Sequence, residues 1–340
     1  MRLLKTVRFG ASALLVAGLL TACGKGTPLT SGTATPPPPF NPSVTSEYPI
    51  PTASSQPAGV ALGSDGNIWF TELGKSKIGQ LNQQAKIAEA VTPTAKAGPN
   101  GIASGPNSRV WFTETNVAKI GQILLTGPTF TDSQLPNAAA RPVGIALGSD
   151  GNMWVTDPGT NAIWKVPQKG KATACPLSPN AQPLGITNGP DGAIWFTEPG
   201  INSIGRLPVG SKCSALTEFK IPTAKASPAG IAAGTDNALW FTERGSRKLG
   251  RIAVTGQVTN EYALAPAQGP NALIEGIDGN FYFTDTPGDQ IGQFLTRNQK
   301  VTLFKVPTAN AQPTAMTLGP DEQVYFTEAG GNHIGQFKYF

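Results

Sequence analysis

The sequence predicts an all-β fold, a seven-bladed β-propeller whose ring is closed by an N-terminal strand. Three observations predict it. One motif recurs seven times, every copy contains strand signals only, and the strand that the last copy lacks is present before the first copy. Repeats of about 40 residues with four short strands each are typical of propeller blades. We expect the propeller to span residues 44–340.

The repeated motif runs through the whole of this region. Its first copy, residues 57–80, reads PAGVALGSDGNIWFTELGKSKIGQ, and its fifth, residues 228–251, reads PAGIAAGTDNALWFTERGSRKLGR. A central aromatic residue marks each copy at spacings of 41 to 45 residues, so that no copy is missing: Trp69, Trp111, Trp154, Trp195, Trp240, Tyr282 and Tyr325.

Three strands are expected within each copy of the motif. In the first copy, the apolar segment 59–62 leads into Asp65-Gly66. Asp-Gly favours the positive φ angles of a tight hairpin turn. The β-branched and aromatic segment 68–71 then forms the second strand, and 77–81 forms the third. The chain after residue 22 shows no helical periodicity.

The fourth strand of each blade lies between successive motifs, as at 216–221 and 301–306. The seventh copy stops at Phe340, just after its third strand. The segment 44–50 matches the fourth-strand pattern and has no motif before it. We therefore expect this N-terminal strand to complete the last blade, because closure removes an exposed sheet edge that would otherwise promote aggregation.

Residues 1–22 are expected to be a bacterial lipoprotein signal peptide. Three basic residues precede an apolar run at 9–20, which is too short to span a bilayer and is typical of a secretory signal. The run ends in LTAC at 20–23, which resembles a lipobox. In such a motif the cysteine, here Cys23, is acylated and becomes the first mature residue. The alternative is an ordinary cleavable signal in which this cysteine has no role.

Residues 23–43 are rich in Thr, Pro and Gly and are expected to form a linker from the lipidated Cys23. Export to the bacterial cell envelope follows, with the outer membrane as the destination if the host is Gram-negative, because Gly24 rather than Asp follows the cysteine. The chain after residue 22 has 23 basic and 21 acidic residues and no basic run with interleaved aromatic residues. We therefore expect a monomer that binds no nucleic acid.

Two further cysteines, Cys175 and Cys213, lie near the expected outer strands of neighbouring blades. In an exported protein they could form a disulfide. Two buried free thiols are the alternative that the sequence leaves open.

The wording of the repeat resembles one known family. The pattern P-x-G-I-A-x-G-x-D-G-x-I-W-F-T-E, followed by N-x-I-G-R and T-E-F-x-I-P-T, is similar to that of the virginiamycin B lyase (streptogramin lyase) family over 44–340. The resemblance implies a propeller enzyme that opens a cyclic depsipeptide by elimination at an ester bond, with a bound magnesium ion. It also implies histidines directly after the repeat proline in two late repeats, and glutamates before one such proline and just beyond a W-F-T-E strand.

These positions hold other residues in this chain. No histidine follows the proline, no carboxylate precedes it, and none lies just past the strand. The residues that follow the proline are Ala58, Asn100, Val143, Leu184, Ala229, Asn271 and Thr314. The only histidine, His333, lies at the start of an expected third strand, and we expect it to be exposed there. The sequence therefore shows no catalytic residue, and whether the protein holds Mg²⁺ or Ca²⁺ is left open.

One carboxylate recurs at the end of every W-F-T-E segment. We expect these residues to form a ring on one face, with each carboxylate accepting hydrogen bonds from loop amides of its own blade. The alternative is a cation site or an acidic recognition surface. The ring consists of Glu72, Glu114, Asp157, Glu198, Glu243, Asp285 and Glu328.

Residues that break the sevenfold pattern are the candidates for ligand binding. Asn100 and Asn271 place amides at the post-proline position, and Arg141 and Arg244 place positive charge on the same face. Two further departures are Glu275 on an innermost strand and Trp164 at the repeat glycine.

The sequence supports two hypotheses of function. The first is a non-catalytic, membrane-anchored platform that binds a small ligand or an envelope protein, because the expected histidines are absent. The second is a carbon–oxygen lyase or lactonase that opens a cyclic ester with a divalent metal, as the family resemblance implies.

Overall fold

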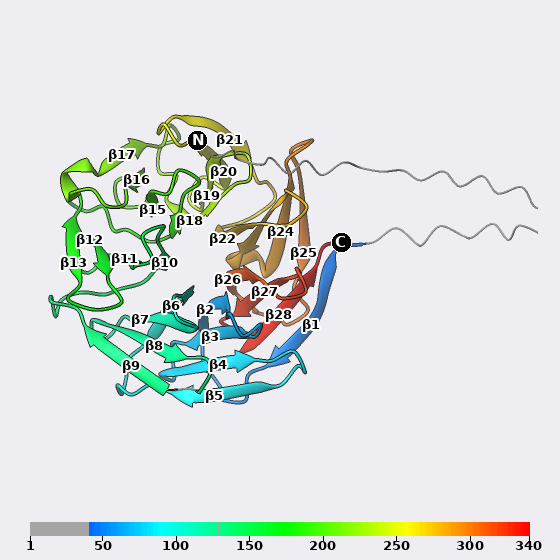
Figure 1. The fold of residues 1–340 in the computed structure, drawn as a ribbon. Helices are drawn as coiled ribbons and strands as arrows, with labels where there is room; N and C mark the ends of the chain where they lie inside the picture. Colours follow the sequence, from blue (N-terminus) through cyan, green and yellow to red (C-terminus); the bar gives the residue numbers. More distant parts are fainter. Residues whose placement is uncertain (1–40, 128) are drawn as a thin grey trace, which may run out of the picture. The chain divides into compact units, whose positions relative to one another are not determined.

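The computed structural model describes residues 41–127 and 129–340. These residues form seven four-stranded antiparallel sheets arranged around a central axis, as in a β-propeller (Figure 1). The predicted fold class is confirmed. The segments that the sequence predicts to be a signal peptide (1–22), a lipidation site at Cys23 and a linker (23–43) lie wholly or almost wholly outside the described residues. Within the described part of the chain, no helix is long and apolar enough to cross a membrane.

In six of the blades, the order of the four strands from the axis outward is their order along the chain. The innermost strands are β2 (Pro57–Leu62), β6 (Pro99–Gly105), β10 (Ile145–Leu147), β14 (Ile186–Asn188), β18 (Pro228–Ala233), β22 (Pro270–Glu275) and β26 (Pro313–Leu318). The second strands are β3 (Ile68–Glu72), β7 (Arg109–Glu114), β11 (Met153–Asp157), β15 (Ile194–Glu198), β19 (Ala238–Glu243), β23 (Phe281–Asp285) and β27 (Val324–Glu328).

The outer half of each blade is formed by a third and a fourth strand. The third strands are β4 (Lys77–Leu81), β8 (Lys119–Leu124), β12 (Ala162–Val166), β16 (Ser203–Leu207), β20 (Lys248–Ala253), β24 (Gln290–Leu295) and β28 (His333–Lys338). The outermost are β5 (Ile87–Val91), β9 (Thr129–Gln134), β13 (Thr173–Pro176), β17 (Thr217–Lys220), β21 (Val258–Ala263), β25 (Lys300–Lys305) and β1 (Ser43–Pro49). Two short 3₁₀ turns, η1 (Cys213–Ala215) and η2 (Thr286–Gly288), complete the elements.

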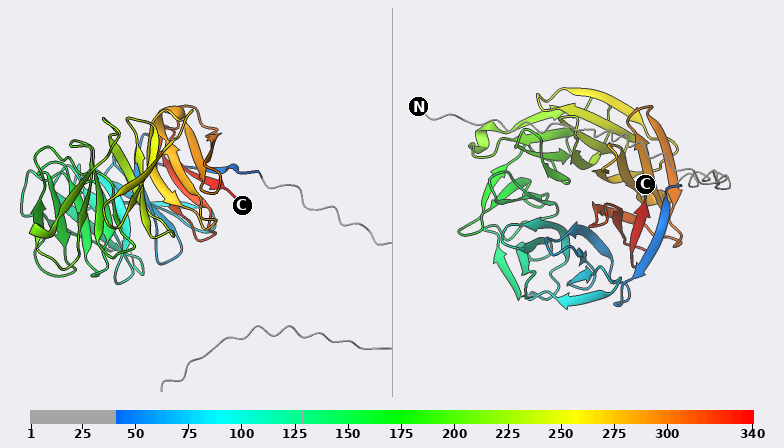
Figure 2. Two further views of the ribbon diagram at one scale, coloured as in Figure 1. Left: turned by 90° about the horizontal axis from the view of Figure 1, so that it is seen from above. Right: turned by 45° about the vertical axis from the view of Figure 1, so that its right-hand side comes forward.

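The ring closes as the sequence predicted. Strand β1 pairs antiparallel with β28, from Ser43 opposite Lys338 to Pro49 opposite His333. The first strand of the described chain is therefore the outermost strand of the seventh blade, and the views in Figure 2 show it beside the C-terminal strand. This pairing leaves the third strand of the last blade without an exposed edge.

The hairpin turns follow from the Asp-Gly pairs. Gly66 and its equivalents Gly151, Gly192 and Gly279 have φ angles between 72° and 75°, as the turn requires. Three other copies place non-glycine residues with positive φ at this position: Ser108, Asn237 and Glu322.

Six of the seven blades pack a phenylalanine of the second strand over a glycine of the third strand. At Gly79, an added Cβ would lie 2.0 Å from Cζ of Phe70, so no other residue fits beneath this ring. Blade 3 inverts the arrangement, with Val155 on the second strand opposite Trp164 on the third. Trp164 is buried, and its indole N–H donates to Asp157 Oδ2 at 2.8 Å. Trp164 is therefore a core residue and not a ligand contact.

Cys175 and Cys213 form a disulfide, with Cα atoms 5.2 Å apart. Cys175 lies on β13, the outermost strand of blade 3, and Cys213 lies in η1, just before the outermost strand of blade 4. Of the two alternatives that the sequence left open, the structure has the bond between neighbouring blades.

The ring has two faces, and the chain enters on one of them. We call the face at which second strands end and third strands begin the mouth face. Glu328 and His333 pair there, whereas Ser43 pairs with Lys338 at the other end of the same sheet. The described chain therefore begins on the face opposite to the mouth face.

Candidate functional site

A ring of buried threonines joins every blade to the next near the axis. The hydroxyl of Thr71 accepts a hydrogen bond from the amide of Gly59 at 2.8 Å and donates to the carbonyl of Asn100 in the next blade at 2.6 Å. The same blade-to-blade bond recurs seven times. The donors are Thr71, Thr113, Thr156, Thr197, Thr242, Thr284 and Thr327, and the acceptors are the carbonyls of Asn100, Val143, Leu184, Ala229, Asn271, Thr314 and Ala58.

These acceptors are the residues that follow the repeat proline. The threonine hydroxyl binds the backbone carbonyl of each of these residues and makes no use of the side chain. The scaffold therefore does not restrict which side chain stands at this position. Sequence reasoning missed this role of the threonines, although the invariant T in W-F-T-E and its equivalents was the available signal.

Five of the seven post-proline residues line a cavity of about 450 Å³ on the mouth face. It is bounded by residues of blades 1, 2, 3, 6 and 7, among them Ala58, Asn100, Val143, Asn271 and Thr314. The lining residues are small, apolar or amide-bearing, and none of them has an ionisable side chain. The cavity offers neutral hydrogen-bonding groups and apolar surface. It offers no general base or acid.

The four candidate ligand-binding residues occupy two different places. Asn100 and Asn271 line the cavity. Asn271 donates from Nδ2 to the carbonyl of Thr314 at 3.1 Å, whereas the amide of Asn100 makes no side-chain hydrogen bond in the described part of the chain. Arg141 and Arg244 are exposed on the same face and do not line the cavity.

The ring of seven carboxylates is fully buried, so it presents no acidic surface. Two members accept hydrogen bonds from loop amides, as we expected of all seven. Asp157 accepts from the amides of Arg141 and Gly159 at 2.7 and 2.9 Å. Asp285 accepts from the amides of Gln268 and Gly269.

The five glutamates of the ring correct that expectation. No loop amide donates to them in the described structure. The hydroxyl of Ser246 donates to Glu243, and the hydroxyls of Ser55 and Thr308 act to lower the pKa of Glu72 and Glu328. Each of the five glutamates lies beside an acidic residue of the outermost strand. The pairs are Glu72 with Glu89, Glu114 with Asp132, Glu198 with Glu218, Glu243 with Glu261 and Glu328 with Glu47.

Burial favours the protonated form of the five inner glutamates. Burial, and then the neighbouring carboxylate, raises the pKa of Glu72, Glu198 and Glu328 to about 8. Burial raises the pKa of Glu114 and Glu243 to about 7. An inner carboxyl that keeps its proton avoids like-charge repulsion with its outer partner, which is why a buried acid pair persists without a cation between its members.

The outer carboxylates are held by the loops that join the blades. The amide and hydroxyl of Thr52 donate to Glu89 at 3.2 and 2.9 Å, and Lys77 lies 3.5 Å from the same carboxylate. His333 occupies the position of Lys77 in blade 7 and lies 3.7 Å from Glu328. Its side chain is 25% exposed, so our expectation of an exposed histidine was wrong. The acid pairs and their neighbours act within the blades and do not reach the cavity.

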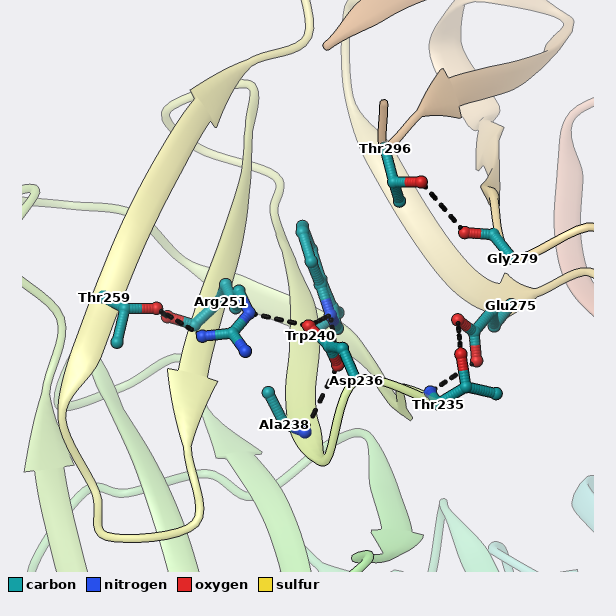
Figure 3. Close-up of polar contacts among 9 residues, drawn as sticks. All are labelled: Thr235, Asp236, Ala238, Trp240, Arg251, Thr259, Glu275, Gly279 and Thr296. Atoms are coloured by element: carbon teal, nitrogen blue, oxygen red, sulfur yellow. Dashed lines mark hydrogen bonds and ion pairs between the residues drawn. The ribbon is translucent and has the colours of Figure 1, made fainter. Parts of the chain in front are cut away.

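Glu275 has a structural role on the opposite face. Its carboxylate accepts hydrogen bonds from the amide and the hydroxyl of Thr235, both at 2.8 Å, and so links blade 6 to blade 5 (Figure 3). In the same view, Arg251 donates to Asp236, which also accepts from the indole N–H of Trp240. These contacts join strands and turns and leave no unpaired charge.

A model of the virginiamycin B lyase family matches residues 41–217 and 210–339. The chain belongs to the virginiamycin B lyase family. A solved streptogramin B lyase is 33% identical, with 86% of this chain and 96% of that chain covered and a TM-score of 0.81. The virginiamycin B lyase of Staphylococcus aureus is 31% identical, with 87% and 99% covered and a TM-score of 0.81.

A third solved structure is that of a catalytically inactive virginiamycin B lyase from Staphylococcus aureus with quinupristin. It is 30% identical, with 87% of this chain and 99% of that chain covered and a TM-score of 0.81. No curated protein matches the chain.

The residues present do not fit the magnesium ion that this family implies. Mg²⁺ is held in proteins mainly by carboxylates together with water. The cavity is lined by amide, hydroxyl and backbone groups without a carboxylate, and the described residues contain no cluster of three or more His, Cys, Asp or Glu side chains. The Asp and Glu side chains of the ring are enclosed within the blades.

Proposed function

We propose that this protein is a lipid-anchored binding protein of the bacterial cell envelope, which holds a ligand in the mouth-face cavity without transforming it. The observation that carries the proposal is the neutral lining of the cavity. An elimination next to a carbonyl needs a base to remove the proton and a charged group to stabilise the developing enolate. Asn100 and Asn271 can donate and accept hydrogen bonds but cannot serve as that base.

The position of the chain's entry supports a role at a membrane surface. Ser43 lies on the face opposite to the cavity. Anchoring at that side leaves the mouth face accessible.

The alternative function is a carbon–oxygen lyase or lactonase that opens a cyclic ester. Membership of the virginiamycin B lyase family favours it. Activity would then require a base from outside the cavity lining.

One assay separates the two functions. The chain 24–340, incubated with quinupristin and Mg²⁺ and followed by mass spectrometry, is expected to leave the depsipeptide intact. An active virginiamycin B lyase from Staphylococcus aureus serves as the positive control. Accumulation of linearised quinupristin above the enzyme-free reaction would overturn the proposal and establish the lyase.

Anchoring is tested independently by cell fractionation. The full chain is expected in the membrane fraction, and Cys23→Ser is expected to abolish the acyl modification that mass spectrometry of the wild type detects. The double variant Cys175→Ser/Cys213→Ser controls for loss of thiols elsewhere and should remain anchored. A membrane-bound, unacylated wild-type protein would contradict the lipid anchor.

A further inference from the structure

The loops of the mouth face carry one sign of charge. The segments that join blades, together with the turns between second and third strands, contain six basic residues and one acidic residue, Asp289. We call the basic residues the rim cations: Lys75, Lys96, Arg141, Lys225, Arg244 and Arg247. All six are exposed.

None of the rim cations has an ionic partner in the described part of the chain. Arg141 donates from Nη1 to the carbonyls of Ala138 and Ala140 at 3.3 and 2.7 Å, which holds its guanidinium at the surface. Asp289 accepts a hydrogen bond from the amide of Gln312 at 2.8 Å, in the loop that leads into blade 7.

The opposite face is arranged differently. There the cations of the third strands are neutralised by the acidic residues of the hairpin turns. Lys165 lies 2.8 Å from Asp150, Arg206 lies 2.7 Å from Asp191, and Arg251 lies 2.7 Å from Asp236. The loops of the opposite face also hold basic residues without an ionic partner, such as Lys169 and Lys171, but acidic residues accompany them in the neighbouring turns. An excess of positive charge in the loops is therefore a property of the face that bears the cavity.

The acidic ring does not offset this charge. Its members are fully buried, and burial raises the pKa of the five glutamates to about 7 or 8. A surface lined by one sign of charge above a low-dielectric interior focuses the field and attracts ligands of the other sign.

Arg244 lies beside the loop that leads into blade 6. A Cβ placed on Gly269 would lie 3.8 Å from Cγ of Arg244 and 2.9 Å from Cγ of Pro287. Arg244 therefore approaches this loop to van der Waals distance, two residues before Asn271, which lines the cavity.

We propose that the ligand of the mouth face is a small organic anion, whose neutral body occupies the cavity and whose carboxylate, phosphate or sulfonate group is bound by the rim cations, Arg244 first among them. This inference rests on the proposed function, because it specifies the ligand of the same cavity. Positive charge on the face that bears a neutral, amide-lined cavity suits a ligand that is charged at one end only.

The test compares two fluorescent probes that differ only in charge. 8-Anilinonaphthalene-1-sulfonate and N-phenyl-1-naphthylamine share one aromatic body, and only the first carries a sulfonate. On the chain 24–340, the anionic probe is expected to bind more tightly than the neutral one. Its affinity should fall between 0.05 and 1 M NaCl, because the Debye length shortens to about 3 Å at 1 M.

Matched variants localise the effect. Arg244→Gln/Arg247→Gln is expected to weaken binding of the anionic probe about tenfold and to leave the neutral probe unaffected. Lys169→Gln/Lys171→Gln removes the same charge from the opposite face and should change neither affinity. Ala58→Trp fills the cavity and should abolish binding of both probes, with circular dichroism showing that each variant is folded.

The outcomes distinguish the two proposals. Equal affinity for both probes, without salt dependence but with loss in Ala58→Trp, would overturn the anionic ligand and leave the cavity as a binding site. Binding of both probes that persists in Ala58→Trp would overturn the cavity as the site and with it the proposed function.

Discussion

At the scale of single residues, the family's repeat separates scaffold from site. The threonine that precedes each ring carboxylate donates to the backbone carbonyl of a post-proline residue in the next blade. Because only the backbone of that residue is bound, its side chain is free to vary. Ala58, Asn100 and Asn271 are held by equivalent bonds at equivalent positions. A chain can therefore keep the propeller of a lyase while holding different side chains at the mouth of its channel.

The threonine ring gives the first prediction. Thr242→Val removes the hydroxyl that donates to Asn271 at 2.6 Å and accepts from Gly230 at 2.9 Å, in a site closed to solvent. Two buried backbone groups lose their hydrogen-bond partner, and we expect the free energy of unfolding to fall by about 1–3 kcal/mol. Urea denaturation measures this change. Thr255→Val, at an exposed turn, is the matched control, and an equal loss in both variants would contradict the role of the ring.

At the scale of elements, blade 3 shows how one repeat departs from the pattern and keeps its packing. Six blades place a phenylalanine over a glycine, and blade 3 places Val155 opposite Trp164. In blade 3 the large side chain is on the third strand and the smaller one on the second, so the same space is filled by the third strand. The indole N–H then reaches the ring carboxylate, where Asp157 replaces a glutamate.

The exchange predicts a coupled pair. Trp164→Gly alone leaves a cavity and is expected to cost about 3–5 kcal/mol, as large-to-small changes in cores do. Val155→Phe alone overpacks the blade and is expected to cost about 1–3 kcal/mol. The double variant rebuilds the phenylalanine–glycine pair of the other blades and should be more stable than Trp164→Gly. Thermal or urea unfolding of all three variants tests this, and strictly additive losses would show that the pair is not exchangeable.

At the scale of the whole molecule, five acid pairs make the stability of the ring depend on pH. The pKa of Glu72 is raised to about 8, mainly by burial, so the folded state keeps a proton that the unfolded chain releases above about 4.5. The folded state binds more protons in this window, and stability therefore falls as pH rises through it. The contribution is complete below the unfolded pKa and is lost once pH exceeds about 8.

Replacing one acid by its neutral isostere tests this dependence. Glu72→Gln cannot ionise and is expected to flatten the fall in stability between pH 5 and 9 by at most about 1.4 kcal/mol per pH unit. Glu322→Gln, on an exposed turn, should leave the slope as in the wild type. Urea denaturation across the pH series measures both slopes, and an unchanged slope in Glu72→Gln would show that this pair does not hold the proton.

The sequence by itself determined the fold of this protein. The seven copies, the Asp-Gly turns and the unpaired segment 44–50 predicted the blades and the closure of β1 onto β28. Strand periodicity and turn chemistry act between residues that are close along the chain, so a single sequence shows them directly. The absence of histidine after the repeat prolines was equally visible.

Tertiary structure decided what the recurring polar residues do. The pairing of Glu72 with Glu89 joins the second and the outermost strand of one blade. The hydrogen bond from Thr71 to Asn100 joins two blades. The bond between Cys175 and Cys213 crosses from one blade to the next in the same way. Such partners are fixed by how sheets stack around the axis, and no local pattern encodes that distance. The ring carboxylates were visible in every repeat, but only the packed blade shows that they are buried, that the pKa of five is raised, and that the loops of the mouth face carry an excess of positive charge.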